Sequence, residues 1–198
     1  MDREIKKLVL ASASPRRREL LAQIGLTAEV VPSAVEENIT TKVPEEAVME
    51  LSRQKAGDVA RFQKAGTLII GADTVVAAEG RILGKPDGHE AAFRMISMLE
   101  GKAHSVYTGV TLIFRREDGD RVKTFSEKTQ VVLYPMTEQE IKAYAESGEP
   151  MDKAGAYAIQ GKFAAFIKKV DGDYSNVVGL PVGRVYQEIK KMLEEEPE

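Results

Sequence analysis

Near the start of the chain, Ser14 and Pro15 are followed by three consecutive arginines, Arg16, Arg17 and Arg18. Ser14 is a good N-cap residue and Pro15 suits the first helical position, so the arginines are expected in a first helical turn. Positive charges cost about 0.3–1 kcal/mol each there, because the helix dipole is positive at that end. A bound phosphate or polyphosphate would offset this repulsion, and a solvated basic turn is the alternative.

Carboxylates follow at two places. Asp73 comes just after the apolar run Thr67–Ile70, which is expected to be a strand that stops at Gly71. Loops beyond strand C-termini form the ligand crevice of open α/β sheets, so Asp73 is a candidate catalytic carboxylate, with a turn cap as the alternative. Glu36 and Glu37 lie in an irregular stretch and are candidate metal ligands.

A lysine occurs on the apolar face of the next expected helix, which begins at Pro44. Lys55 is four residues from both Leu51 and Val59, and the same buried stripe is expected to include Phe62. Lys55 either extends along the helix to the surface or supplies a positive charge to a cleft.

Lys85 and Gln160 lie in two further segments of interest. The residues from Gly80 to Lys85 superficially resemble a P-loop, but the spacing is one residue short and Pro86 replaces the required Ser or Thr, which excludes a Walker A site. Gln160 follows a stretch of small residues and offers both a donor and an acceptor, although a structural role is the alternative. His89 and His104 have no partner at a diagnostic spacing, and both are expected to be structural.

These residue types together describe a site for a nucleotide and a metal. Arginine and lysine neutralise phosphate oxygens, and carboxylates are the ligands that Mg²⁺ or Mn²⁺ prefers. A carboxylate beside such a metal can accept a proton from an attacking water molecule. The expected chemistry is hydrolysis of a phosphate ester or phosphoanhydride.

The composition narrows the possible partners. With 198 residues and a net charge of −3, the chain is long enough for a real core and is not generally basic, so a small anion is a better ligand than a nucleic acid polymer. There are no cysteines, which agrees with a cytoplasmic location. No apolar run approaches the roughly 20 residues needed to span a membrane, and the first apolar run is too short for a signal peptide.

Strand and helix patterns alternate along the chain, which predicts an α/β fold with a mixed, twisted sheet and flanking helices. Residues 75–78 and 81–83 are expected to form a hairpin, and 106–114 and 121–133 two long antiparallel strands. Thr137 and Glu140 predict a capping box. Residues 163–170 are expected to be a strand, and a last helix from Pro181 is expected to bury one apolar face that includes Tyr186.

Several motifs in the chain resemble those of the Maf nucleoside triphosphate pyrophosphatases, also called septum formation proteins. The resemblance runs nearly end to end and is carried by these segments: Ala11–Arg17, Glu37, Leu51-Ser52 with Lys55-Ala56, Gly71–Val76, Leu83–Pro86, Asp152–Tyr157 with Ile159–Gly161, and Val178–Pro181. It implies a single domain over residues 1–198, with two closely packed lobes around a deep cleft, similar to the inosine triphosphate pyrophosphatases. It further implies a divalent metal, Mg²⁺ or Mn²⁺, and a homodimer.

The same resemblance implies roles for individual residues. Asp73 corresponds to the proton acceptor and Glu37 to the cleft carboxylate, the two together being the expected metal ligands, although the choice of Glu37 over Glu36 rests on the resemblance alone. The expected phosphate-binding cations are Arg16, Arg17, Lys55 and Lys85, with Ser12 and Ser14 as polar contacts. Arg18 is expected to face solvent.

Substrate preference is also implied. Arg16, Thr74 and Gln160 resemble the specificity set of the branch that prefers dTTP and UTP, since Gln160 could pair with the edge of uracil or thymine. The expected reaction converts the triphosphate to a monophosphate and pyrophosphate, a house-cleaning activity with a possible link to cell division arrest. Two alternatives remain: the same chemistry on 7-methyl-GTP, and a regulator of septum formation that senses nucleotides without hydrolysing them.

Overall fold

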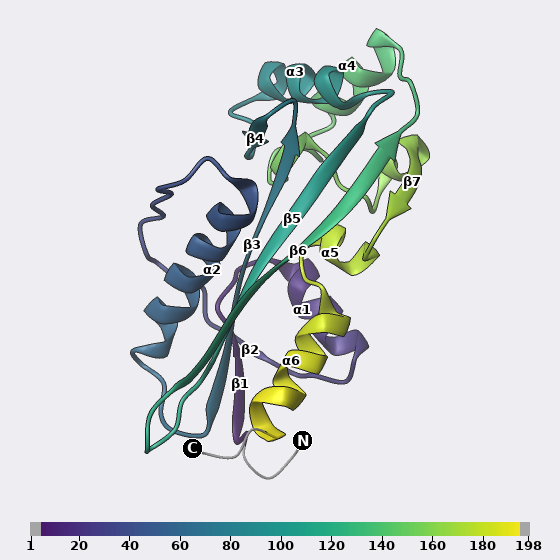
Figure 1. Ribbon diagram of the computed structural model, residues 1–198. Helices are drawn as coiled ribbons and strands as arrows, with labels where there is room; N and C mark the ends of the chain where they lie inside the picture. Colours follow the sequence, from purple (N-terminus) through teal and green to yellow (C-terminus); the bar gives the residue numbers. More distant parts are fainter. Residues whose placement is uncertain (1–4, 195–198) are drawn as a thin grey trace. The chain divides into compact units, whose positions relative to one another are not determined.

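The computed structural model describes residues 5–194 (Figure 1). The strands are β1 (Lys7–Leu10), β2 (Glu29–Val30), β3 (Thr67–Ala78), β4 (Arg81–Leu83), β5 (Ala103–Phe114), β6 (Arg121–Leu133) and β7 (Ile167–Asp171). The α-helices are α1 (Pro15–Gln23), α2 (Pro44–Ala60), α3 (His89–Leu99), α4 (Glu138–Glu146), α5 (Tyr174–Val178) and α6 (Val182–Glu194). Two short 3₁₀ helices are η1 (Ala154–Ala156) and η2 (Lys162–Phe166).

The strands form one seven-stranded mixed sheet in the order β2-β1-β3-β5-β6-β7, with β4 paired to β3. Strand β1 runs parallel to both β2 and β3, whereas β4 is antiparallel to β3 and β7 is antiparallel to β6. The expected α/β fold with a mixed sheet is therefore confirmed. The expected hairpin of β3 and β4 is also confirmed, with Val76 opposite Leu83.

The chain divides into two compact units. The first holds the described residues up to Asp73, Thr108–Glu127 and those from Gly179 onward, and the second holds Thr74–Tyr107 and Lys128–Val178. In the first unit, apolar residues of β1, α2, β3 and β5, with Ala11 just after β1, form a core: Val9, Ala11, Ala56, Val59, Ala60, Ile69 and Ile113. The close packing of the two lobes stays a prediction.

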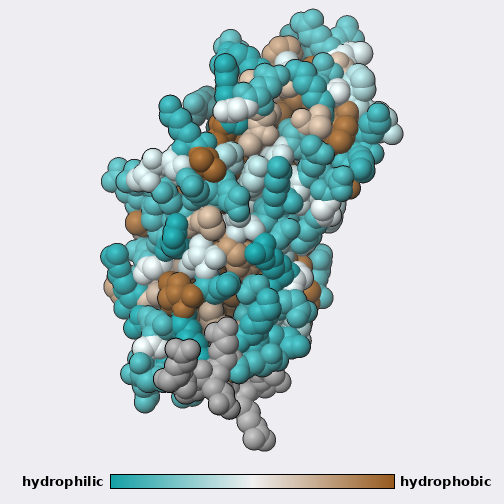
Figure 2. Space-filling view, viewed as in Figure 1, coloured by the Kyte–Doolittle hydropathy of each residue, from teal (hydrophilic) through white to brown (hydrophobic). Residues whose placement is uncertain are grey.

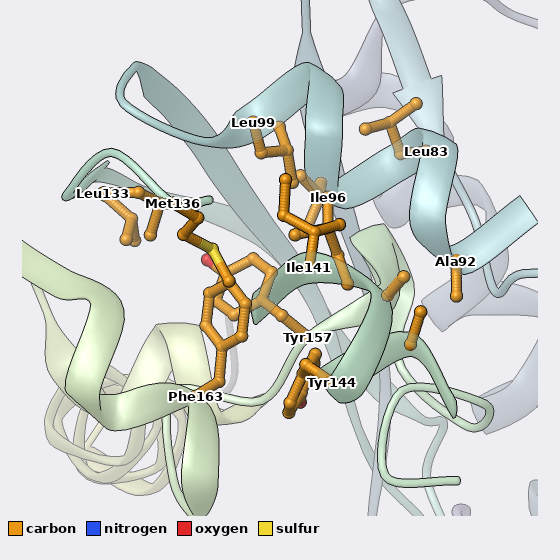
Figure 3. Close-up of a cluster of buried hydrophobic side chains, with 14 of the residues drawn as sticks. Leu83, Ala92, Ile96, Leu99, Leu133, Met136, Ile141, Tyr144, Tyr157 and Phe163 are labelled. Carbon is orange, nitrogen blue, oxygen red and sulfur yellow. The ribbon is translucent and has the colours of Figure 1, made fainter. Parts of the chain in front are cut away.

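The core of the second unit is built where α3 packs against α4 (Figure 3). Ile96 and Leu99 of α3 meet Ile141 and Tyr144 of α4 in this core. The ring of Phe163 lies 4.8 Å from that of Tyr144 and 4.9 Å from that of Tyr157, measured between ring centroids. Aromatic pairs at this separation stabilise a core beyond their buried area.

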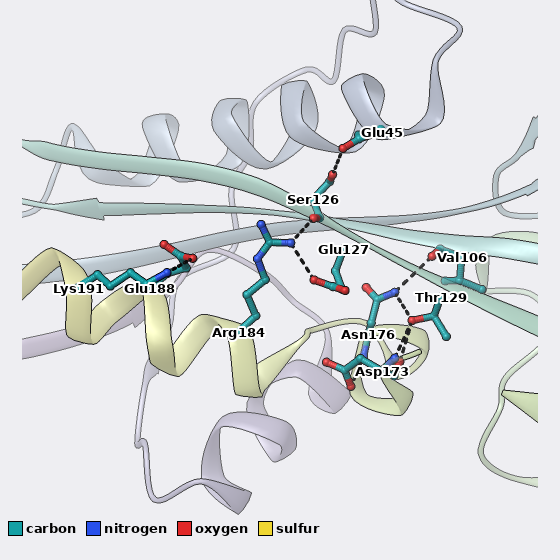
Figure 4. Close-up of polar contacts among 10 residues, drawn as sticks. All are labelled: Glu45, Val106, Ser126, Glu127, Thr129, Asp173, Asn176, Arg184, Glu188 and Lys191. Carbon is teal, nitrogen blue, oxygen red and sulfur yellow. Dashed lines mark hydrogen bonds and ion pairs between the residues drawn. The ribbon is translucent and has the colours of Figure 1, made fainter. Parts of the chain in front are cut away.

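Polar contacts in the first unit attach two helices to β6 (Figure 4). The hydroxyl of Ser126 donates to Glu45 of α2 at 2.7 Å, and Arg184 of α6 donates to the Ser126 carbonyl at 2.6 Å. Buried Ser52 of α2 bonds to Thr111 of β5 at 2.9 Å. These contacts fix α2, which carries Lys55, relative to the strands.

Most residues on the face drawn in Figure 2 are hydrophilic, and its apolar side chains are scattered over that face. No helix among residues 5–194 combines the length and the apolar character needed to cross a membrane.

Away from the candidate site, three local predictions from the sequence are wrong. Phe62 is 82% exposed, because α2 ends at Ala60 and Phe62 lies beyond its buried face. Tyr186 of α6 is also exposed, although Val185 and Ile189 are buried as expected. The strand predicted from residue 163 begins only at Ile167, since residues 162–166 form η2 and bury Phe163 in the aromatic core.

Candidate functional site

The N-terminus of α1 lies directly after β1, as the sequence predicts. Ser14 occupies the N-cap position with extended backbone, and Pro15 takes the first helical position. Within the described chain the Ser14 side chain makes no capping hydrogen bond, and the first turn of α1 contains no acidic residue. The N-terminal N–H groups of α1 and the positive end of its dipole thus have no side-chain cap, which suits an anionic ligand.

Arg17 is held by two elements of the first unit. Its Nε donates to the Gly179 carbonyl at 2.8 Å, and its Nη1 donates to Ser12 Oγ at 3.0 Å. The Ser12 hydroxyl is buried and also accepts from the Ser14 N–H at 3.3 Å. Arg17 therefore joins the loop that precedes α1 to the loop that precedes α6, and its guanidinium has a fixed position.

The charges around Arg17 belong to the other predicted site residues. Burial lowers the pKa of Arg17, Asp73 acts in the opposite direction, Arg16 lowers it further and Glu37 raises it. An arginine remains protonated despite such effects. These influences indicate that both carboxylates and both arginines lie within electrostatic reach of one another in the first unit.

Lys55 contacts both predicted carboxylates. Its Nζ lies 2.5 Å from Asp73 Oδ1 and 2.9 Å from Glu37 Oε1. The Lys55 and Asp73 side chains are only 15% and 14% exposed, whereas the Glu37 side chain is 50% exposed. Lys55 thus points at the carboxylates rather than out to solvent, and it is the carboxylate of Glu37 that the structure brings to this lysine.

The position of Asp73 differs from the sequence prediction. Asp73 lies inside β3, which continues to Ala78, and does not lie in a loop beyond a strand. Strand β1 ends at Leu10, opposite Ile70, so it is β1 that stops beside this point while β3 extends past it. Gly71, Ala72 and Asp73 have poor β propensity, but the place of β3 in the sheet, next to β5, overrides that local preference. Asp73 still lies beside a strand's carboxyl end, that of β1.

The carboxylates of Glu37 and Asp73 fit a divalent cation whose other ligands are phosphate oxygens and water. Glu37 and Asp73 converge on a single point, the ammonium of Lys55. Over residues 5–194 no group of three or more His, Cys, Asp or Glu side chains is placed to hold a metal. Mg²⁺ is commonly bound by one or two carboxylates together with phosphate oxygens and water, so two carboxylates suit a cation that arrives with a phosphate ligand.

The remaining predicted site residues belong to the second unit. Thr74 follows Asp73 in β3, Lys85 is exposed just after β4, and Gln160 is exposed between η1 and η2. The Gly155 N–H donates to the Gly84 carbonyl at 3.0 Å, so the segments that carry Lys85 and Gln160 are joined within their own unit. The roles of these three residues stay predictions.

Both histidines are held by structural contacts, and Arg18 is exposed, as the sequence indicates. His89 Nδ1 lies 2.7 Å from the Ala145 carbonyl, which connects α3 to α4. His104 is buried, its Nε2 lies 2.7 Å from the Tyr157 hydroxyl, and burial lowers its pKa to about 4.

Two supporting features could not be read from residue type alone. The Gly179 carbonyl that receives Arg17 is a backbone group 162 positions further along the chain. The close packing of α2 on the sheet depends on Gly71 and Gly109, whose only signal in the sequence is a glycine inside a strand pattern.

Comparisons with known proteins extend over nearly the whole chain. The sequence profile of the Maf-like protein family matches residues 7–192. A dTTP/UTP pyrophosphatase of Agathobacter rectalis is 54% identical over 201 residues, which cover 95% of this chain and 98% of that protein. Proteins with the same name from Carboxydothermus hydrogenoformans and Lachnoclostridium phytofermentans are 52% and 49% identical, over 93% of this chain and 98% and 94% of their own lengths.

Solved structures give a weaker likeness. The Staphylococcus aureus Ham1 protein aligns with a TM-score of 0.46 and 16% identity, over 65% of this chain and 72% of that chain. The assignment of the fold rests on the sheet described above and not on this alignment.

Proposed function

The chain belongs to the Maf-like protein family, and on this premise we propose that it hydrolyses dTTP and UTP to the nucleoside monophosphate and pyrophosphate. The observation that carries the proposal is the cluster of two carboxylates, Glu37 and Asp73, around Lys55, next to Arg17 at the N-terminus of α1. Relatives about half identical to this chain over nearly its full length carry the name dTTP/UTP pyrophosphatase.

The triphosphate binds at the N-terminus of α1. Arg16 and Arg17 occupy the first turn of this helix, where the N–H groups and the dipole add to their positive charge. The bonds from Arg17 to Ser12 and Gly179 fix the guanidinium before substrate arrives, so little reorganisation is needed when negative charge develops on the phosphates.

Asp73 accepts the proton of the attacking water. The water oxygen forms a bond to the α-phosphorus, the bond from that phosphorus to the oxygen bridging to the β-phosphorus breaks, and pyrophosphate leaves. Glu37 and Asp73 would hold a divalent cation, Mg²⁺ or Mn²⁺, which supplies positive charge to the phosphate oxygens during this step. Lys55 keeps the two carboxylates together and adds a further cation to the phosphate site.

We assign recognition of the base to Gln160, Thr74 and Arg16. The exposed amide of Gln160 can donate to a carbonyl oxygen and accept from the N3–H of uracil or thymine, and Thr74 and Arg16 complete the specificity set. Lys85 adds a fourth cation for the phosphates. The support for these assignments is the match of the segments around Thr74, Lys85 and Gln160 to the family's motifs.

The family resemblance also supports a homodimer in the cytoplasm, with an influence on cell division through nucleotide levels. Light scattering of the purified protein at micromolar concentration tests the dimer directly. A mass of one chain, 21.8 kDa, would contradict it.

A substrate panel tests the reaction. The purified protein with Mg²⁺ or Mn²⁺ is expected to release pyrophosphate and monophosphate from UTP and dTTP, and to act on 7-methyl-GTP much more slowly. Release of orthophosphate, faster cleavage of 7-methyl-GTP, or absence of hydrolysis with every nucleotide would each contradict the proposal.

A substitution at the proposed base tests the mechanism. Asp73→Asn is expected to lower kcat on UTP by roughly 100- to 10,000-fold, because general base catalysis contributes about that much. Binding of UTP, measured by calorimetry, should persist. Asp118→Asn is the control, since Asp118 is an exposed carboxylate paired with Arg116 in the turn between β5 and β6. A cell division phenotype that survives Asp73→Asn unchanged would favour the sensing regulator over the enzyme.

A further inference from the structure

Gly71 of β3 lies where the backbone of α2 comes closest to the sheet. A Cβ atom added at Gly71 would lie 2.5 Å from the Ser52 carbonyl oxygen and 2.7 Å from both the backbone N and the Cβ of Ala56. Contacts under 3.0 Å essentially never occur for a real Cβ, and two of these neighbours are backbone atoms that no rotamer change can move. Only glycine therefore permits this approach of helix and strand.

The contact between α2 and β3 at Gly71 lies next to Lys55 in α2 and next to Asp73 in β3. Gly71 and Asp73 are two residues apart in β3, so they face the same side of the strand. In α2, Lys55 lies between the two contact residues, three positions after Ser52 and next to Ala56. The close approach of α2 to β3 at Gly71 thus lies beside the ion pair of Lys55 Nζ with Asp73 Oδ1, whose length is 2.5 Å.

We propose that Gly71 is a positioning residue for catalysis, which acts by letting Lys55 of α2 reach Asp73 and Glu37. The inference rests on the proposed function only in the part that concerns turnover, because the geometry of the pair can be measured without substrate. In this proposal Gly71 itself contacts neither the nucleotide nor the reacting atoms.

An alanine at position 71 is expected to displace α2 itself, because the atoms that it would meet include the backbone of that helix. Ordinary contact begins at 3.4 Å, so α2 must withdraw by roughly 1 Å before the new Cβ fits. Displacements of about 1 Å at a catalytic group can cost on the order of 100-fold in rate. Gly71→Ala is therefore expected to lower kcat on UTP by roughly 10- to 100-fold and to change KM by less than about threefold.

Gly57 provides the matched control within α2. A Cβ added at Gly57 has nothing within 4 Å, so Gly57→Ala introduces the same methyl group without a clash. This variant should keep the wild-type kcat and gain stability, since alanine is the better helix former. A tenfold loss of kcat in Gly57→Ala would show that the site responds to any change in α2, and would overturn the assignment to Gly71.

A double-mutant cycle separates positioning from a general loss of structure. If Gly71 acts through Lys55, Gly71→Ala should lower kcat much less in the Lys55→Met background than in the wild type. An equal loss in both backgrounds would overturn the proposal. Should Gly71→Ala not fold, Ala56→Ser adds one atom at the same contact from the helix side and is tested in the same cycle.

A measurement without substrate keeps this inference distinct from the proposed function. Lys55 is paired and mostly buried, so its amine should react slowly with an amine-acylating reagent, as followed by peptide mass spectrometry. Gly71→Ala is expected to raise the labelling rate of Lys55 severalfold relative to exposed Lys142, and Gly57→Ala is not. An unchanged Lys55 rate in folded Gly71→Ala refutes the positioning role, whereas a wild type that labels as expected but hydrolyses no nucleotide refutes only the proposed function.

Discussion

The ammonium of Lys55 contacts two carboxylates at once, and this arrangement bears on how a metal binds at the site. The ammonium lies 2.9 Å from Glu37 and 2.5 Å from Asp73, at the point on which both carboxylates converge. A divalent cation that binds the same two carboxylates must compete with it. A triphosphate offers Lys55 alternative anionic partners, so the metal and the nucleotide are expected to bind more tightly together than apart.

Removal of the Lys55 charge tests this competition. Lys55→Met is expected to tighten Mn²⁺ binding in the absence of nucleotide by roughly two- to thirtyfold, because each of its two ion pairs contributes about 0.2–1 kcal/mol. Hydrolysis of UTP by the same variant should fall, since a phosphate-binding cation is lost. Lys55→Arg keeps the charge and serves as the control in a Mn²⁺ titration followed by electron paramagnetic resonance. Equal Mn²⁺ affinities in the wild type and Lys55→Met would contradict the competition.

The sequence singles out the candidate site residues by type and spacing, but it does not predict their contacts. Arg17, Lys55 and Asp73 all stand out by residue type and spacing, and the structure brings them into one unit. The partner of Arg17 is the Gly179 carbonyl, and a backbone acceptor has no signature in residue type. A lysine on an apolar helix face, such as Lys55, can extend to the surface or point into the site. Only the packing of α2 decides between these two directions.

At the scale of elements, the N-termini of α1 and α4 differ in how they are capped. In α4, Thr137 accepts from the Glu140 N–H while Glu140 accepts from the Thr137 N–H, which is the capping box expected from the sequence. In α1, Ser14 holds the N-cap position without a capping bond from its side chain. The cap of α4 stabilises that helix, whereas the N-terminus of α1 stays available to an anion.

Alanine substitutions at the two caps should separate these roles. Thr137→Ala is expected to lower the free energy of unfolding by about 1 kcal/mol and to leave KM for UTP unchanged. Ser14→Ala should cost only a few tenths of a kcal/mol and should raise KM, because it alters the proposed phosphate site. Urea denaturation and steady-state kinetics measure both effects, and the reverse pattern would show that Ser14 is an ordinary cap.

Contacts between elements explain where the structure departs from the local sequence patterns. Turn-forming residues at Gly71 and Asp73 predict the end of a strand, yet β3 runs on to Ala78 because neighbouring strands supply its hydrogen bonds. Phe163 fits a strand pattern equally well but enters η2, where its ring packs between Tyr144 and Tyr157. Helices with strong local signals, such as α4 with its capping box, are predicted correctly from the sequence.

At the scale of the whole molecule, the two units share their longest strands. Residues of β3, β5 and β6 belong to both units, so neither unit is a separate, continuous stretch of chain. We therefore expect the chain to unfold in one transition, in which a group buried in the second unit influences the stability of the whole.

His104 is such a group, and it should make stability depend on pH. The residue is 3% exposed, and within the described chain its Nδ1 has no hydrogen-bond partner. Burial lowers the pKa of His104 from 6.5 to about 4 in the folded state. Between these values the unfolded state binds more protons, so the free energy of unfolding falls as the pH drops from about 6.5 towards 4, and this contribution levels off below 4.

The size of this effect follows from the difference between the folded and unfolded pKa of His104. One pKa unit corresponds to about 1.4 kcal/mol, so His104 is expected to remove roughly 3 kcal/mol of stability over this pH range. Carboxylates also titrate there, and comparison with His104→Gln isolates the histidine because glutamine does not ionise. The difference in unfolding free energy between wild type and variant, measured by urea denaturation at several pH values, should shrink as the pH falls. A difference that is the same at pH 7 and pH 4.5 would mean that His104 has the same pKa in the folded and unfolded states, and would contradict the effect of burial.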